Sequence, residues 1–148
     1  MNILMKIPPP VHGLLLLSLC KGLDMLLPLS MGIYSPSLGM VIAMSGLGIV
    51  IWGLAQFILI KTTPIPLGKP RDLVTIGPYR YTRNPMYLGL LLMVGSVTFF
   101  TGSLVYLLSP LGLFLIIDRL FIPYEEATLD RLFGIRFEAF KREVKRWL

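Results

Sequence analysis

The chain is poor in charged residues and in cysteine, and both shortages narrow its class. Charged residues make up 15% of the 148 residues, whereas a soluble domain typically carries about 25%. Hydrophobic residues reach 55%, which excludes a disordered chain and argues against an ordinary soluble enzyme. Cys20 is the single cysteine, so there is no internal disulfide and no Cys/His cluster for zinc. Neither of the glycine-rich nucleotide-binding motifs occurs, so we expect no soluble nucleotide-binding fold.

Charge is also absent from two long stretches, residues 25–60 and 86–117. Apolar runs of this length are typical of membrane-spanning helices. As one helix, the second stretch would be about 48 Å long, too long for one upright crossing of a core of about 30 Å. Thr101, Gly102 and Ser103 offer a turn near its middle. We therefore predict four transmembrane helices, the last two forming a tight hairpin, at residues 11–31, 38–60, 85–100 and 103–122.

The distribution of basic residues favours four crossings over three. Residues 61–85 contain five Lys or Arg, and residues 118–148 contain seven. Positively charged loops stay in the cytoplasm, and both segments can share that side only if the stretch between them crosses twice. A three-span arrangement would instead move the seven-charge tail across the membrane. We expect both termini in the cytoplasm, and we do not expect nucleic-acid binding, because the basic residues flank apolar segments.

The tail, residues 123–148, is predicted to be helical and amphipathic rather than a fifth span. Its apolar residues recur at spacings of three and four, from Leu129 to Trp147, which places them on one helical face. Gly134 is expected to divide the tail into two helices. The segment should lie on the cytoplasmic interface or pack under the bundle. The overall prediction is a single all-α integral membrane domain over residues 1–148.

The connector 61–85 is the first candidate for chemistry. It contains five prolines together with apolar and aromatic residues. Loops of this length are usually functional or disordered, and a disordered loop usually lacks such apolar residues. We favour an ordered, ligand-binding loop.

Asp118-Arg119 and Glu125-Glu126 form the second candidate cluster. Adjacent helical residues point about 100° apart, so the spacing predicts that at most one of the two glutamates contacts a ligand. Both could instead be solvated carboxylates near a helix N-terminus. With the connector, this cluster offers Arg for a carboxylate, Glu for hydroxyl or ammonium groups and Tyr for an aromatic ring. A zwitterionic, ring-bearing cosubstrate would suit that set.

Two ordered motifs carry a family resemblance. The run LVTIGPY at residues 73–79, followed by RNPMYLG at 83–89, resembles the signature of the isoprenylcysteine carboxyl methyltransferases and the related phospholipid methyltransferases. The pattern from Glu125-Glu126 through Phe133-Gly134 to the closing VKRW at 144–147 resembles the same family's second signature. The similarity covers about residues 40–148. The short form is similar to bacterial members, which implies a prokaryotic inner membrane.

The resemblance implies an integral membrane enzyme that transfers a methyl group from S-adenosylmethionine to a lipophilic acceptor. By position, the residues implied to bind the cosubstrate are Arg71, Asp72, Leu73, Val74, Tyr79, Asn84, Pro85, Met86, Tyr87 and Glu125. We add Arg83, because it or Arg71 could pair with the methionine carboxylate. The candidate catalytic residues are Arg119 and Glu126, and no metal site is expected.

Two positions depart from the family pattern. Asn84 stands where eukaryotic members have histidine, and both side chains can donate a hydrogen bond. The arginine linked with the prenylcysteine substrate falls on Phe121, although Arg119 is half a helical turn away. The tail pattern, by its resemblance to the carboxyl methyltransferases, favours carboxyl O-methylation, with phospholipid N-methylation as the alternative. A non-catalytic membrane protein and a nicotinamide-dependent membrane reductase are the rival classes, and the oligomeric state is left open.

Overall fold

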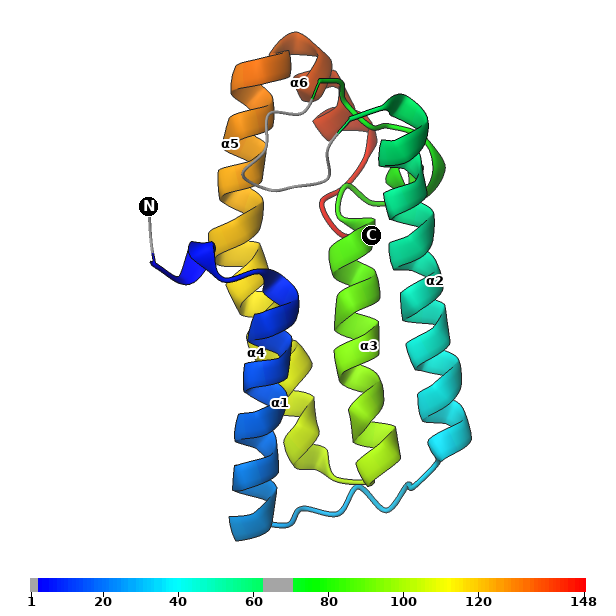
Figure 1. Ribbon diagram of the computed structural model, residues 1–148, viewed down its shortest axis with the longest axis vertical. Helices are drawn as coiled ribbons and strands as arrows, with labels where there is room; N and C mark the ends of the chain where they lie inside the picture. Colours follow the sequence, from blue (N-terminus) through cyan, green and yellow to red (C-terminus); the bar gives the residue numbers. More distant parts are fainter. Residues whose placement is uncertain (1–2, 63–70) are drawn as a thin grey trace.

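The computed structural model describes residues 3–62 and 71–148, and the described part is helical, with no β-strand among those residues. Three of its columns are single helices, and the fourth is built from consecutive pieces (Figure 1). The single helices are α1 (Pro9–Leu26), α2 (Pro36–Ile60) and α3 (Pro85–Thr101). The fourth column contains η3 (Leu104–Leu107), α4 (Leu108–Ile116), the π-helical turn η4 (Ile117–Phe121) and α5 (Ile122–Phe133). The all-helical class predicted from the sequence is confirmed.

Proline defines where these helices begin. Pro9, Pro36 and Pro85 all lie in the first turn of their helices. Proline fits there because its fixed φ suits a helix and its missing N–H would have had no intrahelical partner. The third predicted span, 85–100, therefore agrees with α3 to within one residue at its end.

Backbone contact brings α2 and α3 close together. A Cβ atom added at Gly46 would lie 2.6 Å from the carbonyl oxygen of Gly89, and one added at Gly89 would lie 2.5 Å from the carbonyl oxygen of Gly46. No side chain can occupy either position without moving the helices apart. The connector packs against α2 of this pair through residues 77–80.

The first predicted span extended too far. We expected it to run to residue 31, but α1 ends at Leu26. Pro28 explains the early end, because the residue before a proline is driven out of the helical region, and Leu27 has φ −136° and ψ 76°. The chain then runs beneath the bundle, where Met31 N–H donates to Gly102 O at 2.8 Å and Ser103 Oγ donates to Asp24 Oδ1 at 2.5 Å.

The fourth predicted span was too short. It was expected to end at residue 122, but the helix continues through η4 into α5 and ends at Phe133. The tail therefore starts as an extension of this helix. Gly134, with φ 48°, separates it from α6 (Ile135–Glu143), as the sequence predicted.

Two helices of the described part are long and apolar enough to cross a membrane, namely Pro36–Ile60 and the continuous helix Leu104–Phe133. Pro85–Thr101 is a shorter apolar helix. Both α2 and α4 expose many large apolar side chains, among them Ile58 at 77% and Leu111 at 60%. Such faces suit a lipid environment.

Candidate functional site

The two basic segments meet at one end of the bundle. In Figure 1, α6 and the C-terminal residues lie beside the upper ends of α2 and α3, where the connector also lies. Backbone N–H of Arg83 donates to Lys145 O at 3.0 Å. The carbonyl of Arg146 accepts from Thr82 Oγ1 at 3.0 Å and from Asn84 Nδ2 at 2.9 Å. The tail is thus hydrogen-bonded directly to the connector.

A cluster of buried apolar side chains also packs α6 against the connector. Phe137, Phe140 and Val144 pack against Leu73, Val74 and Tyr79, and all six are buried. Burying apolar side chains of this size contributes about 1.5–3 kcal/mol each. This packing holds residues 73–79 of the connector against α6. Residues 63–70 of the connector lie outside the described part.

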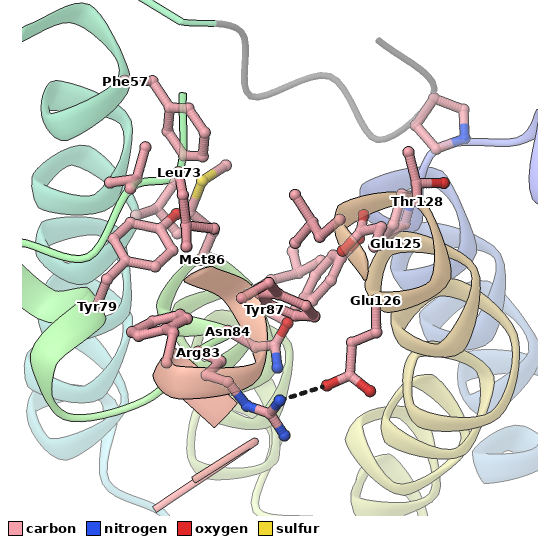
Figure 2. Close-up of a pocket in the computed structure, with 18 of the residues that line it drawn as sticks. Phe57, Leu73, Tyr79, Arg83, Asn84, Met86, Tyr87, Glu125, Glu126 and Thr128 are labelled. Carbon is pink, nitrogen blue, oxygen red and sulfur yellow. Dashed lines mark hydrogen bonds and ion pairs between the residues drawn. The ribbon is translucent and has the colours of Figure 1, made fainter. Parts of the chain in front are cut away.

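A cavity of about 520 Å³ lies between the connector, α5 and the start of α1. Its volume falls within the usual range of about 300–1,000 Å³ for sites that bind small molecules. The polar side chains that line it are Asp72, Tyr79, Arg83, Asn84, Tyr87, Glu125, Glu126 and Thr128. Figure 2 shows the aromatic residues Phe57 and Tyr79 facing Glu125 and Glu126 across it.

The cavity has a polar end and an apolar end. Its polar residues come from the connector, the start of α3 and α5. Deeper between α2 and α3, the lining is Leu47, Val50, Leu90 and Met93. Pro8, Pro9 and Pro10 line it from the start of α1. A ligand with a polar part and an apolar part would match this arrangement.

Glu125 forms one polar contact across the cavity. The hydroxyl of Tyr87, on α3, donates to Glu125 Oε1, on α5, at 2.5 Å. The two side chains lie together at the centre of the close-up (Figure 2). Since Glu125 also lines the cavity, its carboxylate is placed to accept a hydrogen bond from a bound molecule.

Glu126 is the centre of an ionic network. Arg83 Nη1 lies 3.2 Å from its Oε1, and Arg146 Nη2 lies 2.7 Å from its Oε2. Arg146 also contacts Asp118 Oδ1 at 3.3 Å, and Trp147 Nε1 donates to that oxygen at 3.0 Å. The hydrogen bond to Glu126 keeps the pKa of Arg146 above its usual range.

Both glutamates line the cavity, and neither is a solvated carboxylate of a free helix end, because α5 continues the preceding helix. The two side chains point in different directions, one to Tyr87 and the other to the two arginines. That at most one of them contacts a ligand stays a prediction.

Tyr79 and Asp72 hold the connector in different ways. The Tyr79 ring meets Phe57 edge to face with centroids 5.7 Å apart, and burial, with a smaller effect of the Glu125 charge, raises the pKa of its phenol. Tyr79 therefore stays protonated at neutral pH. Asp72 accepts from Leu73 N–H at 2.8 Å and from Arg136 at 2.9 Å, and these hydrogen bonds lower the pKa of its carboxyl.

The structure brings most of the predicted site residues to this cavity. All of them line it except Arg71, Pro85 and Arg119. Arg71 is exposed, and its backbone N–H donates to Thr62 Oγ1 at 2.9 Å. Pro85 is buried in the first turn of α3. Arg119 points away, with a side chain 78% exposed and 3.6 Å from Asp118, so its expected catalytic position is corrected.

Sequence reasoning missed several contributors to this region. Thr82 and Arg146 fasten the tail to the connector, and Pro8, Pro9 and Pro10 form part of the wall at the start of α1. Asp118, which the sequence placed in the second cluster, anchors Arg146 and Trp147. The closing VKRW was noted only as a motif. The sequence did contain a basic Arg-Trp ending and an acidic residue at position 118 that could pair with it. Residue spacing alone does not predict that the two are in contact.

Comparison with known proteins identifies the family. A family model described as PEMT, phospholipid methyltransferase, matches residues 32–136. The chain belongs to the phospholipid methyltransferase family. This family lies within the superfamily that also contains the isoprenylcysteine carboxyl methyltransferases, so the resemblance seen in the motifs is confirmed.

An uncharacterized protein of Haemophilus influenzae is 35% identical to the chain over 63 residues, which is 43% of this chain and all of that protein. No solved structure matches the chain. Family membership together with the apolar helices indicates a membrane methyltransferase. The matched region includes the connector, α3 and α5, the elements that supply most of the cavity wall.

Proposed function

We propose that this protein is a membrane methyltransferase that uses S-adenosylmethionine to methylate a lipophilic acceptor. The observation that carries the proposal is the single cavity wall formed by both family motifs, with a polar end beside an apolar end. The polar end suits a zwitterionic nucleoside, and the apolar end suits a hydrocarbon chain. Family membership supports the methyl-transfer chemistry.

The polar end offers a partner for each part of the donor. Arg83 is proposed to pair with the methionine carboxylate, for which a guanidinium is the best-suited side chain. Glu125, which Tyr87 holds in place, is proposed to accept a hydrogen bond from a ribose hydroxyl or from the amino group of the donor. Phe57 and Tyr79 provide an aromatic wall for the adenine ring.

The donor, when bound, supplies an electrophilic methyl group on a positively charged sulfur. The protein's contribution is to hold donor and acceptor in line and to exclude water. Leu73, Val74, Phe137 and Phe140 form a dry wall on the connector side. An anionic acceptor would lose its charge together with the sulfonium as the methyl group transfers, so a water-poor site favours the reaction.

The state of Glu126 bears on which acceptor is used. A carboxylate acceptor needs no general base, whereas an amine or alcohol acceptor needs one. Glu126 was the candidate base, but Arg83 contacts its Oε1 and Arg146 contacts its Oε2, so both carboxylate oxygens already have partners. This supports carboxyl O-methylation. Phospholipid N-methylation is the second candidate, and the description of the matching family favours it.

The proposed topology follows from the basic residues. We place four helical columns across the membrane, with the connector and the tail together on the cytoplasmic side of a prokaryotic inner membrane. Contacts between residues 82–84 and 145–146 support a shared side. The acceptor would then enter from the bilayer and the donor from the cytoplasm.

Ligand binding by the purified protein tests the proposal. We expect calorimetry in detergent to show binding of S-adenosylhomocysteine and no binding of NADPH. Binding of NADPH alone would favour the membrane reductase, and binding of neither would favour a non-catalytic protein. Methyl transfer to a prenylcysteine analogue, compared with transfer to phosphatidylethanolamine, would then identify the acceptor.

A further inference from the structure

Two arginines share one carboxylate at the polar end of the cavity. Arg83 Nη1 lies 3.2 Å from Glu126, but the Nε and Nη1 atoms of Arg83 are buried without a hydrogen-bond acceptor among the described residues. Arg146 donates to Glu126 through Nη2 at 2.7 Å and Nε at 3.4 Å. Arg146 is therefore the main hydrogen-bond donor to Glu126, and Arg83 retains N–H groups that are available to a ligand.

The two arginines also differ in position. Arg83 lines the cavity and Arg146 does not. Arg146 reaches Glu126 from behind the wall, where Asp118 contacts the same guanidinium at 3.3 Å. Arg83, Arg146, Glu126 and Asp118 carry two positive and two negative charges, and Arg119, 3.6 Å from Asp118, adds a third positive charge at the surface.

We propose that Arg146 is a positioning residue that neutralises Glu126 and so leaves Arg83 free to bind the carboxylate of the donor's amino-acid part. The inference rests on the proposed function. The Glu126 side chain is only 18% exposed, and a buried carboxylate that loses its partner is strongly destabilised. Arg83 can turn to a ligand because Arg146 stays on Glu126. Without Arg146, the ligand and Glu126 would compete for the same guanidinium.

The side chain of Arg146 can be tested apart from its backbone. Thr82 and Asn84 are held by the carbonyl of Arg146, which every substitution retains. Asp118 keeps its hydrogen bond from Trp147 when the guanidinium is removed. Arg146→Ala therefore removes the charge from Glu126 and leaves the connection between tail and connector in place.

The experiment measures two ligands by calorimetry in detergent. S-adenosylhomocysteine carries the carboxylate, and 5′-methylthioadenosine lacks the amino-acid part. We expect Arg146→Ala to weaken S-adenosylhomocysteine binding about tenfold and to leave 5′-methylthioadenosine binding unchanged. Adding Glu126→Gln removes the competing carboxylate, so the double variant Arg146→Ala/Glu126→Gln should return to within about threefold of the wild-type affinity.

Lys141→Ala is the matched control, because Lys141 is also a tail cation in ion pairs, with Asp130 at 2.9 Å and Glu138 at 2.7 Å, and does not line the cavity. It should bind both ligands as the wild type does. Wild-type affinity in Arg146→Ala, equal loss of both ligands, or no recovery in the double variant would overturn the role of Arg146. A wild-type protein that binds neither ligand would instead overturn the proposed function.

Discussion

The hydroxyl of Tyr87 donates a 2.5 Å hydrogen bond to Glu125 and joins α3 to α5 across the cavity. The contact links the two family motifs, which are separated in sequence by the whole of the α3–α4 hairpin. It also fixes the direction in which the carboxylate points. A side chain oriented by a neighbour in this way is ready to accept a ligand hydrogen bond without further ordering.

Removing the Glu125 carboxylate should weaken donor binding while the protein stays folded. A hydrogen bond contributes about 0.5–1.5 kcal/mol net, so we expect Glu125→Ala to weaken S-adenosylhomocysteine binding by up to about tenfold. Tyr87→Phe, which keeps the carboxylate and loses only its orienting partner, should have a smaller effect. Calorimetry measures both, and unchanged affinity in Glu125→Ala would remove Glu125 from the site.

Alanine substitutions at two glycines of α2, Gly46 and Gly48, should have different effects on the stability of the protein. Gly46→Ala would place a methyl group 2.6 Å from the carbonyl oxygen of Gly89, and overpacking of this kind costs about 1–3 kcal/mol. Gly48→Ala is the control, because nothing lies within 4 Å of the added atom. Thermal unfolding in detergent should show a lower midpoint for Gly46→Ala alone, and equal midpoints would contradict the close helix contact.

Narrowing the apolar end of the cavity should change acceptor selection without changing donor binding. Leu47 lies deep on α2 in the cavity wall, and Leu47→Phe should shorten the space for a hydrocarbon chain. Excluding about two methylene groups at about 0.8 kcal/mol each would lower kcat/KM for long-chain acceptors about tenfold. Short-chain acceptors and S-adenosylhomocysteine binding should be unaffected.

Leu59→Phe provides the matched control for that variant, since Leu59 is 69% exposed on the same helix and does not line the cavity. It should behave as the wild type with acceptors of every length. A uniform loss across chain lengths in Leu47→Phe would show that the apolar end does not hold the acceptor.

The proposed topology can be tested with single cysteines. Cys20 is the chain's one cysteine and is buried, so a new exposed cysteine gives the dominant labelling signal. Arg80→Cys in the connector and Arg142→Cys in α6 should be protected from a membrane-impermeant maleimide in intact cells, and Ser37→Cys should react. Reaction of only one of the first two would separate the connector from the tail and contradict the site.

The main features of the fold were predictable because apolar patterning determines them locally. The charge-free runs indicated where the apolar helices lie, and Gly134 marked the break in the tail. The end of the first helix and the length of the fourth column were not. Pro28 shortened α1, and η4 carried the last column past Asp118 and Arg119 without a break.

The candidate site was predictable to the level of which segments meet, but less so in its contacts. The partners of Glu125 and Glu126 come from α3, the connector and the tail, and residue spacing does not report which segments pack against α5. Arg119 was chosen because it lies close in sequence to the family's substrate-linked position. In three dimensions the tail folds back, so that Arg146 joins Arg83 on Glu126.

The uninterrupted helix from Leu104 to Phe133 connects the cavity to the lipid layer around the protein. Its apolar half exposes Leu111 and Leu115, and its other half carries the carboxylates that face the cavity. Helices tilt to match the thickness of the hydrocarbon layer around them. A change in lipid chain length would therefore change the tilt of this helix, and with it the position of Glu125 and Glu126 relative to α2 and α3. The rate of turnover should then depend on bilayer thickness at constant substrate concentration.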